Sequence, residues 1–263
     1  RLTKDGYSHS TIKLIHNLLY PSFEMAVDDD IIRKNPAKDA LGDNGEPAKE
    51  KMALTPSQQN RLLSFVEQSS VYNVYLPMLQ IMIGTGCRCG ELIGLTWADV
   101  DMEKKEVSIS CQLIYKNYGD GYKFHVSTPK TDAGIRKIPM SDTVYKAFAA
   151  QKRQNFLQRI PRNVEIEGRT DFIFMSKNGR PLMPSAVNNV LYNIVAAYNK
   201  QETEQAKKEK REAEYMPSIS AHTLRHTGCT RMAEQGLDMK VVQYIMGHAN
   251  IGVTMEVYNH ITE

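Results

Sequence analysis

The sequence has few cysteines and no long apolar run. Its four thiols are Cys87, Cys89, Cys111 and Cys229, and the one close pair is C-x-C, which is not a zinc-binding spacing. So few cysteines in 263 residues exclude a disulfide framework, and we expect reduced thiols in a cytoplasmic protein. No apolar stretch approaches the ~18 residues that cross a bilayer, so we expect no membrane association. The sequence has no pattern typical of a signal peptide. Because it starts at Arg1 rather than Met, we expect a fragment.

An excess of one charge is also missing. The sequence has 33 Lys and Arg against 30 Asp and Glu, for a net charge of +3. This balance alone does not predict nucleic-acid binding, but a basic groove can coexist with acidic outer faces. Hydrophobic residues make up 41% of the chain, which is enough for a sizeable core and excludes global disorder.

A segment rich in Gly, Pro and charge, residues 41–54, divides the chain. We expect it to be a linker between a small helical domain, residues 1–40, and a larger domain, residues 55–263. Helical spacing of apolar residues predicts a helix over 10–27, which Pro21 should kink or split.

The larger domain changes its hydrophobic period twice. Thr55-Pro-Ser-Gln58 is a capping box with proline at the first helical position, and Asn117–Gly121 is typical of a hairpin turn. Residues 201–214 alternate opposite charges, which favours a solvated helical extension over a DNA-contacting segment.

The fold class expected is mainly α with a small antiparallel sheet of about three strands (α+β). We expect helices at 55–68, 74–83, 89–95, 142–159, 184–200, 221–235, 238–246 and 252–260, and strands at 107–115, 122–126, 136–139 and 171–174.

Two arginines stand in motifs suited to an anionic phosphate. His222 and Arg225 are three residues apart and share a helix face, and Arg88 lies in Thr85-Gly-Cys-Arg-Cys-Gly-Glu91-Leu. A guanidinium is a planar fork of donors that matches phosphate oxygens. Two of them on one phosphodiester would stabilise the extra charge of a pentacoordinate transition state.

Other interpretations of the neighbouring residues remain open. His222 and His226 stand four apart and could bind zinc, but Thr223 occupies the position of the glutamate base in H-E-x-x-H. Tyr258 is either a packing residue or a nucleophile. A free phenol has a pKa near ~10, and we expect two arginines and nearby histidines to favour the phenolate.

In their order, these segments resemble the tyrosine recombinases, the integrases of phages and conjugative transposons. The resemblance covers residues ~55–263, with 1–40 similar to the carboxy-terminal part of a helical core-binding domain. It implies a lysine in a β-hairpin, for which Lys130 in Thr-Pro-Lys-Thr fits best, with Lys123 and Lys137 as alternatives. The implied catalytic residues are Arg88, Lys130, His222, Arg225, His248 and Tyr258, which stands ten residues after His248.

The resemblance also implies an activity. A member of this family cuts and rejoins DNA strands at specific sites through a 3′-phosphotyrosine, and so integrates and excises a mobile element. The implied partner is double-stranded DNA at recombination sites, bound by a dimer or tetramer, in the bacterial cytoplasm and associated with the nucleoid. No metal or other cofactor is implied. A type IB topoisomerase and a non-catalytic DNA-binding protein are the alternatives.

Overall fold

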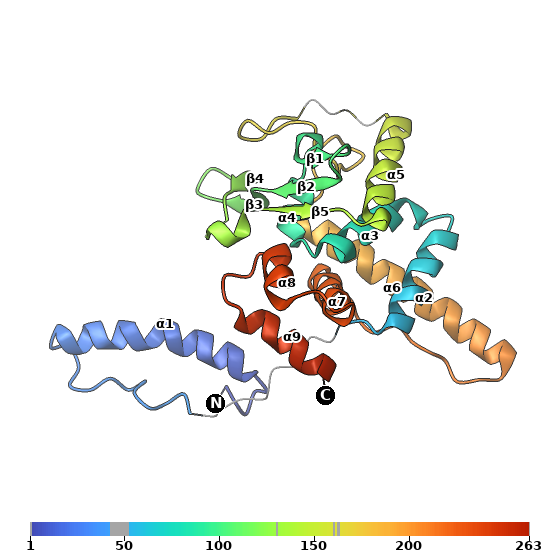
Figure 1. Cartoon of the computed structure of the whole chain (residues 1–263). Helices are drawn as coiled ribbons and strands as arrows, with labels where there is room; N and C mark the ends of the chain where they lie inside the picture. Colours follow the sequence, from blue (N-terminus) through green and yellow to red (C-terminus); the bar gives the residue numbers. More distant parts are fainter. Residues whose placement is uncertain (1, 43–52, 130, 160, 162–163, 263) are drawn as a thin grey trace. The chain divides into compact units, whose positions relative to one another are not determined.

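The computed structural model describes residues 2–42, 53–129, 131–159, 161 and 164–262. The chain forms two compact units, Arg1–Lys51 and Met52–Glu263 (Figure 1). Most of the expected linker, residues 43–52, lies outside the described residues, so the expected domain limits stay a prediction. The expected fold class is confirmed, because helices predominate and the strands form small antiparallel sheets.

The first unit consists of one long helix and a segment that returns along it. The helix α1 (His9–Asp28) continues through Pro21, so of the two expected effects of this proline, a kink or a split, the split does not occur. Asn35 holds the turn that follows, since its side-chain amide donates to the Tyr20 carbonyl at 3.0 Å. Part of the helix surface is apolar and exposed, at Leu14, Leu18 and Met25.

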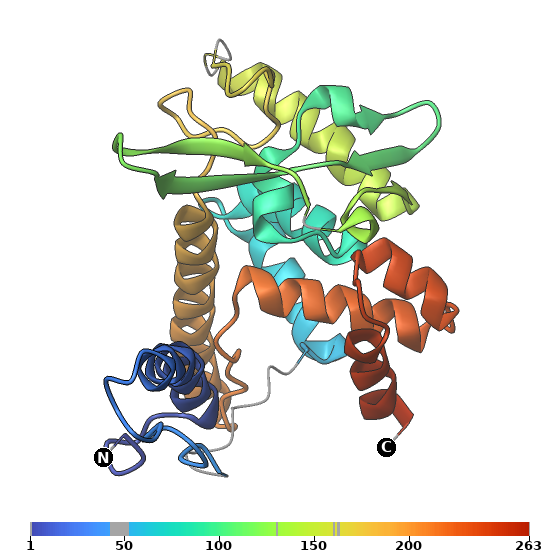
Figure 2. The same cartoon turned by 90° about the vertical axis from the view of Figure 1, so that its left-hand side faces the viewer.

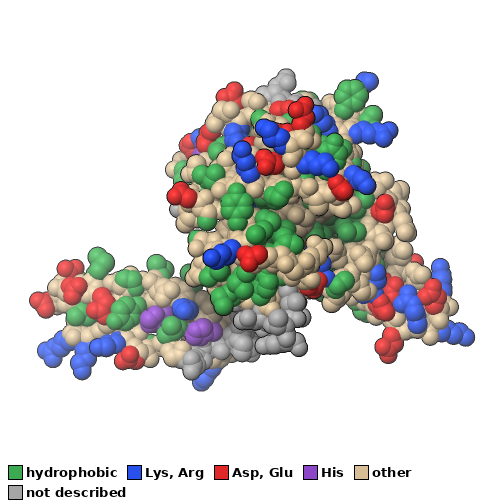
Figure 3. Space-filling view, in the orientation of Figure 1, with side chains coloured by type: hydrophobic (Ala, Val, Ile, Leu, Met, Phe, Trp, Pro, Cys, Tyr) green, Lys and Arg blue, Asp and Glu red, His purple; other side chains and the backbone are tan. Residues whose placement is uncertain are grey.

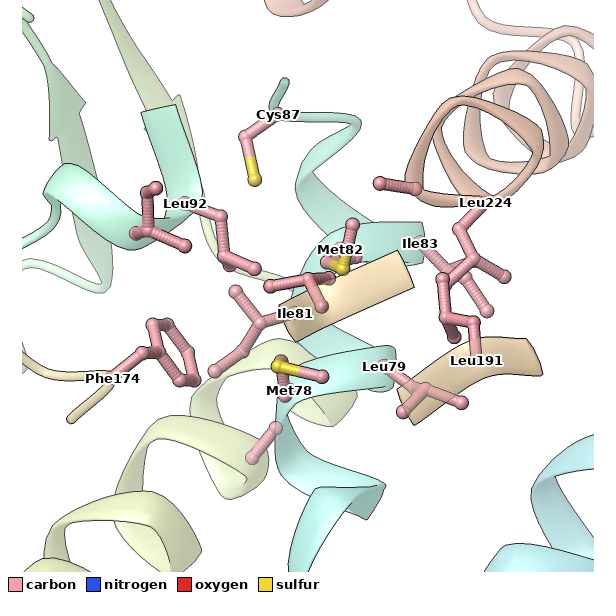
Figure 4. Packing of buried hydrophobic residues seen from close by; sticks show 14 of the residues in the cluster. Met78, Leu79, Ile81, Met82, Ile83, Cys87, Leu92, Phe174, Leu191 and Leu224 are labelled. Carbon is pink, nitrogen blue, oxygen red and sulfur yellow. The ribbon is translucent and has the colours of Figure 1, made fainter. Parts of the chain in front are cut away.

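The core of the second unit is built around α3 (Leu76–Thr85), a mainly apolar helix in which most residues are buried. Figure 4 shows its Met78, Ile81 and Met82 among side chains from other elements, including Leu191 and Leu224. The helices α5 (Asp142–Gln158) and α7 (Ala221–Glu234) pack against it.

Glycines allow these two helices to approach α3 closely. A Cβ at Gly228 would lie 2.1 Å from the Ile83 carbonyl oxygen, and one at Gly84 would lie 2.3 Å from Val144. Two further helices, α2 (Pro56–Gln68) and α6 (Pro184–Glu209), complete the surroundings of this core. The close approach of α7 matters for function, because α7 carries Arg225.

The strands of the described residues form two separate sheets. β1 (Val100–Asp101), β2 (Glu106–Ile109) and β5 (Arg136–Pro139) make a three-stranded antiparallel sheet in the order β1-β2-β5. β3 (Gln112–Asn117) pairs only with β4 (Tyr122–Ser127) among the described residues, as a hairpin that extends beyond the helices of the second unit on one side (Figure 2).

Two expected strands are therefore wrong in detail. The expected strand 107–115 is divided between β2 and β3, which belong to different sheets. The apolar residues of this stretch alternate, and no turn residue marks the point where β2 ends and β3 begins. That point is determined only by the pairing of the two strands with different partners. The expected strand 171–174 makes a single bridge, Thr96 to Phe172, and is otherwise an irregular buried segment.

The charged segment 201–214 extends α6 to Glu209 and then folds back. Arg211 contacts two carboxylates, with Nη2 at 3.1 Å from Glu202 Oε2 and Nε at 2.7 Å from Glu209 Oε2. Opposite charges therefore pair as expected, and Figure 3 shows them mixed at this end of α6. The segment is not wholly solvated, because Glu202 is buried.

The last helices follow the expected pattern within one or two residues. They are α7, α8 (Met239–Met246) and α9 (Gly252–Thr262), and the short α4 (Cys89–Gly94) lies upstream. In the parts of the chain described above, no helix combines the length and apolar character needed to cross a membrane.

Candidate active site

Arg88 precedes α4 and is held by the glutamate of its own motif. Its backbone N–H donates to Glu91 Oε2 at 2.8 Å, which satisfies a free amide at the start of the helix as in a capping box. Its Nη1 donates to Glu91 Oε1 at 2.8 Å, and its Nη2 donates to the Gly247 carbonyl at 3.1 Å. The spacing R-x-x-E therefore orients the guanidinium of a side chain that remains 43% exposed.

Arg225 lies on α7 and is buried beside the same segments. Nη1 donates to the Gly86 carbonyl and Nη2 to the Met246 carbonyl, both at 2.6 Å. Burial, and then the positive charge of Arg88, lower the pKa of Arg225 to about 10. The side chain is still charged at neutral pH, and the repulsion shows that the two arginines act on one another through space.

A pocket of about 350 Å³ brings three of the expected site residues together. Arg88, His222 and Arg225 line it, together with backbone and small side chains at Gly90 and Ser220. Two like charges around one hollow repel each other, and an anion placed between them would relieve that repulsion. The pocket is therefore suited to a phosphate group.

His222 and His226 stack edge to face, with ring centroids 5.3 Å apart, and only His222 lines the pocket. Within the described residues, no group of three or more His, Cys, Asp or Glu could hold a metal ion. Among these residues, none therefore completes a zinc site with His222 and His226. His222 is the exposed member of the pair, in the position expected for a group that meets a substrate.

His248 follows the turn that ends α8 and is half-buried next to the arginines. Its Nδ1 lies 3.0 Å from the hydroxyl of Thr254, which is fully buried. Burial, followed by the charges of Arg225 and Arg88, lowers the pKa of His248 from 6.5 to about 4. The ring is therefore neutral at pH 7 and can hydrogen-bond with a phosphate oxygen without adding charge.

This pKa predicts a pH dependence of stability. The folded ring takes up a proton near pH 4, whereas an unfolded ring does so near 6.5. The contribution of His248 to stability is therefore present above pH ~6.5 and lost as pH falls toward 4. An NMR titration of the imidazole nitrogens should give a midpoint well below 6 for His248, and His248→Asn should remove that signal. A midpoint near 6.5 would contradict the buried, repelled position described above.

Tyr258 lies on α9, and its hydroxyl donates to the Leu237 carbonyl in the connection between α7 and α8. Burial, then the charges of Cys229 and Asp238, raise the pKa of the phenol. The expected lowering of this pKa by arginines and histidines is thus not observed. Tyr258 also does not line the phosphate pocket, so in this arrangement its oxygen is engaged elsewhere.

Lys130 lies outside the described residues. Of the alternatives, Lys123 pairs with Asp120 at the hairpin tip, and the backbone N–H of Lys137 donates to the Tyr244 hydroxyl at 3.1 Å. The choice among the three lysines therefore stays a prediction. The thiols next to Arg88 are free, and burial raises the pKa of Cys87 to about 12, so it is protonated at neutral pH.

One residue of the site was missed in the sequence, namely Arg136 on β5. Its side chain is fully buried, and its Nη2 donates to Glu91 Oε2 at 2.8 Å. A signal was available, because alternation along a strand places Arg136 on the same face as Ile138, which belongs to the core.

Comparison with known proteins agrees with the motifs. Residues 52–263 match the family model described as the phage integrase family. The transposase from transposon Tn916 of Enterococcus faecalis is 36% identical over 266 residues, which cover all of this chain and 61% of that protein. The ICEBs1 integrase of Bacillus subtilis is 24% identical over 99% of this chain and 64% of its own length. The chain thus spans about three fifths of these relatives.

Solved structures give the same result. The Tn1549 transposon integrase, in complex with a circular intermediate DNA, matches with a TM-score of 0.84 and 36% identity, covering 98% of this chain and 77% of that one. A lambda integrase dimer bound to a core site shares the fold at a TM-score of 0.55 and 16% identity, over 95% of this chain and 73% of that one. With its ordered R-x-x-E, H-x-x-R, G-H and Tyr motifs, the chain belongs to the phage integrase family of tyrosine recombinases.

Proposed function

We propose that this chain carries the catalytic part of a site-specific DNA recombinase that integrates and excises a mobile element. The observation that carries the proposal is the pocket in which Arg88 and Arg225 repel one another beside His222. The family membership and a relative bound to a circular intermediate DNA support double-stranded DNA as the substrate.

In the proposed reaction, the Tyr258 oxygen attacks the scissile phosphorus. A bond forms between the phenol oxygen and the 3′-phosphate while the bond to the 5′ oxygen breaks. His222 accepts the phenol proton, and Lys130 donates a proton to the leaving 5′ oxygen. Arg88 and Arg225 neutralise the charge of the pentacoordinate transition state.

His248, neutral at pH 7, donates a hydrogen bond to a phosphate oxygen in this scheme. Religation is the reverse reaction with a 5′ hydroxyl from another strand. Tyr258 must first exchange its bond with the Leu237 carbonyl for one to the substrate, so the described arrangement precedes DNA binding.

The hairpin β3–β4 offers a surface for the DNA backbone and bases. Three of its tyrosines are exposed, Tyr115 at 40%, Tyr118 at 61% and Tyr122 at 70%. Lys116 lies 4.9 Å above the Tyr118 ring, so a cation and an aromatic face are presented together. This combination suits phosphate contact and stacking.

Residues 1–40 belong, in this proposal, to a helical core-binding domain, 41–54 to a linker and 55–263 to the catalytic domain. The protein acts as a dimer or tetramer on specific recombination sites, because strand exchange joins two duplexes. Its place is the bacterial cytoplasm, associated with the nucleoid.

No metal ion takes part in the proposed chemistry, because the phosphotyrosine conserves the energy of the broken bond. Cleavage of a duplex carrying the recombination site should therefore proceed at an unchanged rate in excess EDTA. A loss of cleavage that zinc or magnesium restores would contradict this and would revive the His222 and His226 pair as ligands.

Strand exchange distinguishes the recombinase from a type IB topoisomerase. A plasmid with two copies of the recombination site should give resolved or inverted products, whereas a topoisomerase would only relax supercoils on any plasmid. Relaxation of a plasmid without sites, and no recombinant products, would favour the topoisomerase. DNA binding without either product would favour a non-catalytic DNA-binding protein.

A further inference from the structure

The side chain of Arg136 is fully buried, and all three of its nitrogens are used. Nε donates to the Ile245 carbonyl at 2.6 Å. Nη1 donates to the Gly134 carbonyl at 3.0 Å and to Glu91 Oε1 at 3.2 Å, and Nη2 donates to Glu91 Oε2 at 2.8 Å. Only a planar fork of donors can make this set of bonds, so lysine could not replace it.

The contacts of Arg136 reach both arginines of the phosphate pocket. Glu91, which it holds, is also the carboxylate that orients Arg88. At the end of α8, three consecutive carbonyl oxygens accept from three different arginines. They are those of Ile245, which accepts from Arg136, of Met246, which accepts from Arg225, and of Gly247, which accepts from Arg88.

The turn at Gly247 is shaped around Arg136. Gly247 has a φ of +62°, which favours glycine, and a Cβ there would lie 2.9 Å from Arg136 Nη1.

Arg136 also has an electrostatic effect on Glu91. Burial raises the pKa of the Glu91 carboxyl, but the hydrogen bonds and charge of Arg136, followed by the hydrogen bonds from Arg88, lower the pKa overall. Glu91 therefore stays ionised and keeps its hold on Arg88.

We propose that Arg136 is a positioning residue for both arginines of the phosphate pocket. It fixes Arg88 through Glu91, and it fixes Arg88 and Arg225 through the carbonyls at the end of α8. The inference rests on the proposed function. Arg136 does not line the phosphate pocket, so it acts on the substrate only through these residues.

The test compares Arg136→Lys with Arg169→Lys. Arg169 also pairs with a largely buried carboxylate, Asp99, and its Nη2 donates to the Gly94 carbonyl at 3.2 Å, but none of these groups lines the pocket. Single-turnover cleavage of a duplex, DNA affinity and thermal unfolding are measured for both variants. We expect Arg136→Lys to slow cleavage by about 10²-fold with affinity within about twofold, because a shift of ~1 Å in a positioned group costs that much. Arg169→Lys should cleave like the wild type.

Two further measurements separate positioning from general damage. In an Arg88→Lys background, adding Arg136→Lys should slow cleavage by less than a further factor of about three, because both substitutions affect the position of the same side chain at residue 88. The Arg88 and Arg225 side-chain Nε–H signals in NMR should shift in Arg136→Lys and not in Arg169→Lys, which needs no cleavage to be observed. Should Arg136→Lys not fold, Gly247→Ala displaces the guanidinium and should give the same loss of cleavage.

Several results would overturn the proposal. These are wild-type cleavage by Arg136→Lys or Gly247→Ala, equal losses in Arg136→Lys and Arg169→Lys, full additivity with Arg88→Lys, or unmoved Nε–H signals. Failure of the wild-type chain to cleave any duplex would instead count against the proposed function, and the NMR signals would still decide the role of Arg136.

Discussion

Tyr258→Phe should abolish the covalent protein–DNA complex, by at least about 10⁴-fold, while DNA affinity stays within about twofold. The change keeps the ring and removes only the hydroxyl that attacks phosphorus. It also removes the hydrogen bond to the Leu237 carbonyl, which should cost roughly 1 kcal/mol of stability. Denaturing gels of a suicide duplex measure the adduct, and a mobility shift of intact duplex measures affinity.

Tyr244→Phe is the matched control for this variant. Tyr244 lies on α8, is 52% exposed and also has its hydroxyl in a hydrogen bond, from the Lys137 N–H. It should form the adduct at the wild-type rate. An adduct that persists in Tyr258→Phe and disappears in Tyr244→Phe would assign the nucleophile to Tyr244 and refute the carboxy-terminal assignment.

Lys130→Ala should slow cleavage of ordinary DNA by about 10²–10⁴-fold, because a positioned general acid contributes that much. A duplex with a 5′-bridging phosphorothiolate expels a sulfur that needs no proton. That duplex should therefore restore cleavage by Lys130→Ala. Quench-flow measurements on both duplexes give the ratio of the two rates directly.

Arg88→Ala is the control, because its role is to stabilise charge and the better leaving group does not replace it. Arg88 is partly exposed and is thus the safer choice than Arg225, whose removal leaves the Gly86 and Met246 carbonyls without their donor. Equal rescue of Lys130→Ala and Arg88→Ala would show that the roles are misassigned. If the phosphorothiolate duplex does not restore cleavage by Lys130→Ala, the general acid is instead Lys123, Lys137 or a histidine.

Local chemistry explains which elements could be predicted. Thr55 and Gln58 form the expected capping box, with Gln58 N at 3.2 Å from Thr55 Oγ1 and Thr55 N at 3.0 Å from Gln58 Oε1. Ser220 caps α7 in the same way, through its hydroxyl. These signals lie within four residues, so the sequence shows them completely.

Elements that depend on distant partners could not be predicted in this way. The break between β2 and β3 depends on pairing with β5 and β4, and nothing at Ser110 or Cys111 marks a turn. Pro21 is the opposite case, since the proline does not divide the helix and is accommodated within α1. In these cases tertiary contacts outweigh the local propensity of the residues, so propensity alone predicts the wrong secondary structure.

The site shows the same division. The motif spacing predicted a shared site for Arg88, His222 and Arg225, and these three side chains line one pocket. The role of Arg136 was missed because a strand arginine is usually exposed. Alternation with Ile138 indicates its buried face, but its bonds to Glu91 and Ile245 depend on segments far away in the sequence. The pKa of Tyr258 could not be predicted either, because it depends on where α9 lies.

Mapping the protein–DNA bond itself tests the role of Tyr258 as the nucleophile most directly. The wild-type chain is incubated with a suicide duplex that carries the recombination site, the complex is digested, and the nucleotide-bearing peptide is sequenced by mass spectrometry. We expect a 3′-phosphate attached to the oxygen of Tyr258 and a free 5′ hydroxyl on the other fragment. A bond to another residue, a 5′-phosphate linkage, or cleavage without any covalent complex would contradict it.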